Sequence, residues 1–301
     1  MLQRTTWPQK TRELHNHHMD STAWNDFPVR DDDIIIGTYA KSGTTWMQQI
    51  VSQLIFAGAE GIDVSAISPW LDMRILPRAE TRAMLESQTH RRFIKTHLPL
   101  DALSFSWRAK YLYIARDGRD VAWSAHNHFA KCRDEFFDLL NETPGRIGPP
   151  MPRLPADVRE FFLDWMEQDG APLWSFWENI RTWWAYRHLP NIMLVHFADL
   201  KRNPEKMIRQ IATFLEIEVA ADAWSLILEH CSFDYMKRNA EKMAPLGGAP
   251  WEGGAGTFIN KGTNGRWRDV LSADECRRYE ALAVEQLGAE CAAWLKDGGR
   301  P

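Results

Sequence analysis

Residues 31–56 constrain the fold of this chain more than any other stretch. They read DDDIIIGTYAKSGTTWMQQIVSQLIF, with three consecutive isoleucines between an acidic run and a small polar loop. A short, wholly apolar run is typical of a central parallel strand, so we expect a strand over Asp33 to Tyr39. Beyond the loop, five apolar residues recur at helical spacing: Trp46, Ile50, Val51, Leu54 and Ile55. This periodicity predicts a helix packed on the sheet, which completes half of a βαβ unit.

Three more segments are short and rich in β-branched or aromatic residues: RRFIKT (91–96), KYLYIA (110–115) and NIMLVHF (191–197). Helical periodicity, with start signals at Asn203-Pro204 and Ser272, predicts helices over Arg119–Ala130, Leu173–His188, Pro204–Leu215, Ala223–His230 and Ala273–Leu287. Alternation of strands and helices indicates an α/β fold with a central parallel β-sheet flanked by helices.

The chain has no linker-like stretch, so we expect one domain over residues 1–301, with an irregular segment over 1–30. Two further segments are dense in Pro or Gly, Asn141–Pro155 and Ala244–Thr263. They are either flexible connections or lids over a pocket. We therefore treat 131–173 and 244–263 as candidate lid loops.

Charge and composition narrow the function classes. A net charge of -4 argues against a nucleic-acid partner, so any anion site must be local. No membrane span or signal peptide is expected, which favours a cytoplasmic location. The four cysteines lack CxxC spacing, and His15, His17 and His18 fit metal-ligand spacing weakly, so no metal is expected.

The loop between the first strand and its helix consists of Lys41, Ser42, Gly43, Thr44 and Thr45. Such a turn exposes backbone N–H groups at a helix N-terminus, hydroxyl donors and a mobile cation, a set that suits a phosphate or phosphosulfate. The simpler alternative is a glycine turn capped by threonine. A Walker A loop is excluded because its lysine follows the second glycine, whereas here the lysine precedes it.

Four segments carry a resemblance to a known family: TYAKSGTTW (38–46), FIKTHLP (93–99), IARDGRDVAWS (114–124) and FINKGTNGRW (258–267). Together they resemble the sulfotransferases that use 3'-phosphoadenosine 5'-phosphosulfate (PAPS). The resemblance implies a three-layer, P-loop-like fold. It also implies sulfuryl transfer from PAPS to a hydroxyl of a small molecule, an alcohol or phenol, with adenosine 3',5'-bisphosphate (PAP) as product and no metal.

The resemblance also assigns the nucleotide-binding residues. Lys41 and the backbone from Ser42 to Thr45 would hold the 5'-phosphosulfate. Trp46 would stack on adenine, although it is equally a residue for the helix core. Arg116 and Ser124 would bind the 3'-phosphate, whereas from the residues alone Arg116 equally pairs with Asp117 or Asp120.

The tail segment matches the family signature RKGxxGDW only in part. Four residues match: Lys261, Gly262, Gly265 and Trp267. Asn260 and Arg266 depart from it, so one charge expected on the 3'-phosphate is missing. Phe233 matches the family phenylalanine that packs on adenine, and Phe197 stands where a tyrosine is common.

His97 and Lys95 follow a predicted strand, at the sheet edge where open α/β folds place reactive groups. A lone histidine is usually structural. Here the family's KTH motif implies that His97 is the general base, that Lys41 stabilises the leaving oxygen and that Lys95 stabilises the sulfuryl oxygens.

Two rival functions stay open. A P-loop kinase would need ATP and magnesium, and a non-catalytic relative would bind nucleotide without turnover. We expect the acceptor pocket to draw on 63–90 and 131–173, with His126 and His128 either facing it or serving as polar helix residues. The family dimer motif would fall at Arg268–Arg277 and is barely retained there. The oligomeric state stays open: a homodimer is possible, but one formed through this motif is not expected.

Overall fold

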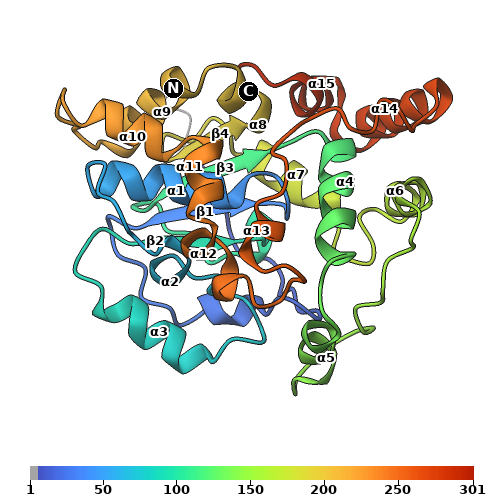
Figure 1. Cartoon of the computed structure of the whole chain (residues 1–301), viewed down its shortest axis with the longest axis horizontal. Coiled ribbons are helices and arrows are strands. Elements are labelled where there is room, and N and C mark those ends of the chain that lie inside the picture. Colours follow the sequence, from blue (N-terminus) through green and yellow to red (C-terminus); the bar gives the residue numbers. More distant parts are fainter. Residues whose placement is uncertain (1–5) are drawn as a thin grey trace.

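The computed structural model describes residues 6–301, and its centre is one parallel sheet (Figure 1). The strands are β1 (Ile34–Thr38), β2 (Phe93–Thr96), β3 (Lys110–Ala115) and β4 (Ile192–His196), in the order β2-β1-β3-β4. All four predicted strands are confirmed, with ends that differ by no more than two residues. The α/β fold class with a central parallel sheet is confirmed as well.

Fifteen α-helices surround the sheet in the described part of the chain: α1 (Thr44–Ile55), α2 (Val64–Ile67), α3 (Arg78–Ser87), α4 (Gly118–Phe129), α5 (Asp134–Glu142), α6 (Val158–Glu167), α7 (Phe176–Trp184), α8 (Phe197–Arg202), α9 (Pro204–Leu215), α10 (Trp224–His230), α11 (Phe233–Arg238), α12 (Ala240–Met243), α13 (Ala255–Phe258), α14 (Ala273–Leu287) and α15 (Ala289–Asp297). Three short 3-10 helices are η1 (Ser21–Trp24), η2 (Leu100–Ala102) and η3 (Pro245–Gly248). The predicted helices correspond to α1, α4, α7, α9, α10 and α14.

Two helix starts were predicted for the right physical reason. The Asn203 side chain accepts a hydrogen bond from the backbone N–H of Lys206, with Pro204 at the first helical position. Ser272 forms a capping box with Glu275 at the start of α14. Each cap satisfies backbone donors that a helix N-terminus otherwise leaves unpaired.

The isoleucine run of β1 is buried on both faces, as its lack of alternation predicted. Ile34 and Ile36 join a core cluster with residues of α1, α9 and α10, whereas Ile35 joins the cluster formed by α4, α6 and α7. Successive side chains of a strand point to opposite faces, so one run supplies both cores. Figure 1 shows the result as three layers, with α1 and α4 on opposite sides of the strands.

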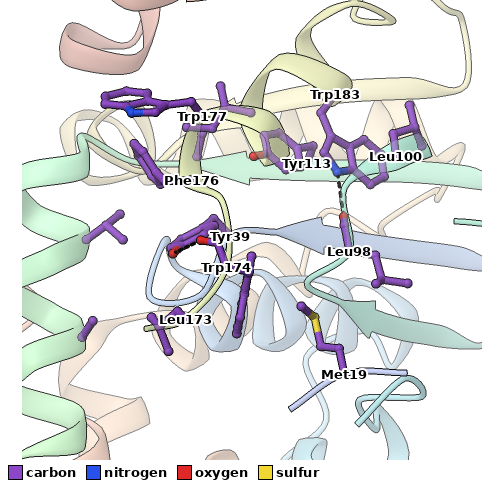
Figure 2. Close-up of a cluster of buried hydrophobic side chains, with 14 of the residues drawn as sticks. Met19, Tyr39, Leu98, Leu100, Tyr113, Leu173, Trp174, Phe176, Trp177 and Trp183 are labelled. Atoms are coloured by element: carbon purple, nitrogen blue, oxygen red, sulfur yellow. Dashed lines mark hydrogen bonds between the residues drawn. The ribbon is translucent and has the colours of Figure 1, made fainter. Parts of the chain in front are cut away.

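An aromatic cluster fixes the strand ends (Figure 2). Tyr113 of β3 stacks on Trp183 of α7 with ring centroids 5.0 Å apart, and Trp183 Nε1 donates a hydrogen bond to the Leu98 carbonyl at 3.1 Å. A Cβ added at Gly37 would lie 2.5 Å from Trp183 Cζ2. The indole therefore ties β1, β3 and the segment after β2 together.

Two loop predictions need correction. The segment 131–173 is not one loop, because it contains α5 and α6; the stretches 131–133, 143–157 and 168–173 lie outside these helices. The predicted loop Asn141–Pro155 began too early: Phe137 and Leu140 of α5 are buried, and their burial extends the helix to Glu142. The segment 244–263 contains η3 and α13. In the N-terminal segment, residues 6–30 are irregular apart from η1 and isolated bridges, and the rest lies outside the described residues.

Across residues 6–301, every helix lacks the combination of length and apolarity needed to cross a bilayer.

Candidate active site

The carboxyl ends of all four strands open into one cavity of about 400 Å³. This is the edge at which open α/β sheets bind ligands, because chain reversals there leave a crevice. Twelve predicted site residues line the cavity: Lys41, Gly43, Thr44, Thr45, Trp46, Lys95, His97, Arg116, Ser124, Phe233, Lys261 and Gly262. Ser42 does not line it. It is buried behind the loop, and its Oγ has no hydrogen-bond partner among the described residues.

The loop 41–45 adopts a backbone that only a glycine permits at one position. Lys41 has φ 68° and Gly43 has φ 115°. A Cβ on Gly43 would lie 2.8 Å from Phe197 Cδ2 and 2.9 Å from Ile114 Cδ1. Left-handed residues at short spacing turn neighbouring N–H groups toward the same side, and α1 starts at Thr44 with its positive dipole end at the cavity.

Two partly buried lysines face the cavity without a carboxylate in salt-bridge contact among the described residues. Lys41 Nζ lies 2.9 Å from His128 Nδ1 and 4.9 Å from the centre of the Phe258 ring. Burial, reinforced by repulsion from Arg116 and Lys95, lowers the pKa of Lys41 to about 7. Burial likewise lowers the pKa of Lys95 to about 8, against a partial rise from Asp72. An anion in the cavity would restore both charges.

His97 is 6% exposed and has a defined tautomer. Its Nδ1 lies 2.8 Å from the Thr38 carbonyl oxygen, which can only accept, so Nδ1 carries the hydrogen and Nε2 keeps its lone pair. The Trp70 ring packs edge-on at 4.5 Å between centroids. Burial and the neighbouring Lys95 lower the pKa of His97 to about 3, so the ring is neutral at pH 7 and the lone pair of Nε2 is free.

Arg116 does not form the surface ion pair that was the alternative to phosphate binding. Its Nε donates to Asn264 Oδ1 at 3.0 Å and its Nη2 donates to the Thr263 carbonyl at 2.9 Å. Asp117 pairs with Arg119 instead. Arg116 is 7% exposed, and burial lowers its pKa without removing the charge that a guanidinium keeps. The tail segment thus packs on Arg116, the residue predicted to bind the 3'-phosphate.

The tail also meets the predicted adenine contacts. Gly262 has φ 60°, and a Cβ there would lie 2.8 Å from Phe233 Cδ2, so the backbone lies on the phenylalanine ring. Trp46 is half-buried, donates from Nε1 to the Cys231 carbonyl at 2.8 Å, and presents its edge to Phe197 at 5.4 Å between centroids. Its place in the cavity wall favours the ligand-facing alternative over a role in the helix core.

Sequence reasoning missed two cations, Lys201 and Arg266, that line the same cavity. Lys201 lies on α8, directly after β4, and its Nζ donates to the Gly262 carbonyl at 2.6 Å. The position of Lys201 just after the fourth strand was the signal from which this residue could have been predicted. Six Lys or Arg side chains line the cavity against one carboxylate, Asp120, although the chain has a net charge of -4. The cationic surface is therefore local, as the composition required.

The remainder of the cavity wall is apolar and aromatic. Its large side chains are Trp70, Phe129, Phe136, Trp174, Trp251 and Phe258. The segment 63–90 contributes to this wall as predicted, whereas 131–173 contributes only Phe136. The segment 244–263, predicted as a candidate lid loop, supplies much of this wall. His128 faces the cavity, but His126 does not: its Nε2 lies 2.8 Å from the Pro155 carbonyl oxygen.

No cluster of three or more metal-ligating side chains occurs within residues 6–301.

Comparison with known proteins agrees with this geometry. The model of the sulfotransferase domain family matches residues 31–289. This chain belongs to the sulfotransferase family. It is 33% identical to a glycolipid sulfotransferase of Mycobacterium tuberculosis over 97% of both chains, and 27% identical to mouse sulfotransferase 1B1 over 97% of this chain and 96% of the other. The predicted family is confirmed.

Solved structures show the same fold at lower identity. The crystal structure of mouse sulfotransferase SULT7A1 complexed with PAP matches with a TM-score of 0.70 at 22% identity, over 91% of this sulfotransferase and 90% of the mouse chain. Retinol dehydratase in complex with retinol and PAP matches with a TM-score of 0.67 at 24% identity, over 93% and 86% of the two chains.

Proposed function

We propose that this sulfotransferase moves a sulfuryl group from PAPS to a hydroxyl group of a small-molecule alcohol or phenol, with His97 as the general base. One observation carries the proposal: a cationic region and an apolar region share a single cavity, and His97, Lys95 and Lys41 all line it. The cationic region fits an anionic donor. The apolar region fits the body of an acceptor, in keeping with the similarity to a glycolipid sulfotransferase.

The residues present fit the donor nucleotide. Lys41 and the backbone from Ser42 to Thr45 would hold its 5'-phosphosulfate. Arg116, Ser124, Lys261 and Gly262 would hold its 3'-phosphate, while Trp46 and Phe233 would bracket adenine. Lys201 and Arg266 offer the charge that Asn260 lacks. The two partly buried lysines without a carboxylate partner support this fit, because withdrawing a cation from water is costly unless an opposite charge arrives.

When bound, PAPS supplies the sulfuryl group. His97 Nε2 takes the proton of the acceptor hydroxyl as that oxygen becomes the nucleophile, and the Thr38 carbonyl keeps the ring in the required tautomer. Lys41 would stabilise the negative charge on the leaving oxygen, and Lys95 would stabilise the charge on the sulfuryl oxygens. The aromatic wall excludes water and so strengthens these interactions.

Calorimetry tests the donor assignment. PAP titrated into the protein in EDTA should bind tightly, whereas ATP with magnesium should bind weakly. The reverse preference would favour the kinase alternative. His97→Ala should bind PAP as the wild type does and lose about 10²–10⁴-fold in sulfuryl transfer, the usual contribution of a general base. Normal turnover by His97→Ala would remove the base assignment, and PAP binding without any transfer by the wild type would favour the non-catalytic alternative.

A further inference from the structure

A second neutral imidazole faces the cavity from the irregular segment before η1. His18 lines the cavity, is 4% exposed, and belongs to none of the family motifs in the sequence. Its Nδ1 contacts Nδ1 of His17 at 2.5 Å, and no described residue bonds its Nε2. A buried polar atom without a protein partner, placed at a cavity, is available to a ligand.

The hydrogen-bond chain fixes the tautomer of His18. His17 Nε2 lies 2.8 Å from the Pro172 carbonyl oxygen, which only accepts, so His17 carries its hydrogen on Nε2. Burial lowers the pKa of both His17 and His18, so both rings are neutral and His17 Nδ1 is an acceptor. His18 must then donate from Nδ1, which leaves its Nε2 as an acceptor. His97 reaches the same state through the Thr38 carbonyl.

The two imidazoles share their aromatic neighbours. Trp70 lies 6.1 Å from His18 and 4.5 Å from His97 between ring centroids. Trp174 lies 5.9 Å from His18 and 5.8 Å from His97. Two hydrogen-bond acceptors thus flank a pair of indoles. His18 and His97 therefore lie in the same aromatic part of the cavity wall.

We infer that His18 is a specificity-determining residue that accepts a hydrogen bond from a second hydroxyl group of the acceptor. The inference rests on the proposed function and names its substrate class: a molecule with an apolar body and at least two hydroxyl groups, one at His97 and one at His18. An acceptor with one hydroxyl leaves His18 Nε2 desolvated and unpaired, and sites of that kind reject the analogue that lacks the group.

Binding to the PAP-saturated protein tests the inference without turnover. Calorimetry would compare 2,7-dihydroxynaphthalene with 2-naphthol and with 7-methoxy-2-naphthol, which has a similar bulk but no second donor. The diol should bind about tenfold more tightly than either, beyond its statistical factor of two, as expected for one additional hydrogen bond in a buried site. His18→Phe should abolish this preference, mainly by raising the affinity for 2-naphthol, because no unpaired acceptor atom is then left beside the ligand.

Two further variants separate a specific effect from a structural one. His18→Gln keeps an acceptor oxygen and should retain part of the preference for the diol. His188→Phe, at an exposed position of the chain, should behave as the wild type does. Equal affinity of the wild type for all three ligands, binding of none of them, or an equal loss for diol and naphthol in His18→Phe would overturn the inference. Failure of PAP to bind would instead refute the proposed function.

Discussion

Lys41 Nζ lies 2.9 Å from Nδ1 of His128. The ammonium donates to a neutral ring rather than to a carboxylate, because burial also lowers the pKa of His128 well below its ordinary value. No opposite charge is at hand, and burial lowers the pKa of Lys41 to about 7. The loop lysine is therefore set to gain its full charge when an anion arrives.

This state of Lys41 predicts that PAP binding takes up a proton above pH 7. The free pKa of about 7 rises in the complex, so the affinity should fall with increasing pH, by up to tenfold per pH unit. Calorimetry from pH 7 to 9, in buffers that differ in ionisation enthalpy, measures both quantities. Lys41→Met should bind PAP more weakly, and its PAP affinity should depend less steeply on pH. An affinity independent of pH in the wild type would contradict the prediction.

His97 should stay neutral throughout the physiological range. Its pKa of about 3 follows from burial and from Lys95, so its ¹⁵N-imidazole resonances should not titrate between pH 5 and 8. The resonances of His97 are the ones that are missing from the spectrum of His97→Gln. A His97 midpoint near pH 6.5 would show that the ring is solvated.

Gly262→Ala should weaken PAP binding. Its φ of 60° disfavours alanine, and the added Cβ would displace the Phe233 ring proposed to contact adenine. We expect a loss of about tenfold in affinity, since roughly 1–2 kcal/mol is typical of a left-handed non-glycine residue. Gly256→Ala is the matched control, because that glycine has no positive φ and open space around its Cβ. Equal affinities for the two variants would argue against contact between this turn and the nucleotide.

The ion pair between Arg92 and Asp33 stabilises the start of the sheet. Both side chains are fully buried, and Arg92 donates to both carboxylate oxygens of Asp33 at 2.7 and 2.5 Å. Arg92→Met should lower the free energy of unfolding by about 3–5 kcal/mol, because it leaves a buried charge unpaired. Arg82→Met, which breaks the exposed pair with Glu86, should cost about 1 kcal/mol or less. Denaturant unfolding measures both.

A double variant separates the charge from the packing. Asp33→Leu combined with Arg92→Met should be less destabilised than the sum of the single changes, since no charge is left behind. Additive losses would show that the two side chains act independently.

The sequence by itself determined the sheet, the anion loop and the family. The isoleucines of β1 lie in a run too short and too uniform to be anything but a doubly covered strand, and the loop 41–45 is a local turn. These features depend on neighbours along the chain. Lys41, Lys95, His97 and Arg116 could be predicted for the same reason, because each lies at the end of a strand or in the short segment after it.

Only the tertiary structure decided how distant segments complete the site. Lys201 and His18 belong to no recognised motif, Arg266 departs from the family signature of its own segment, and His128 was predicted only as an alternative; each reaches the cavity through packing between segments far apart in the sequence. The tautomers of His18 and His97 depend on carbonyl groups that the fold brings within hydrogen-bond distance. The pKa of Lys41 depends on burial, and burial is a property of the assembled fold that no local pattern specifies.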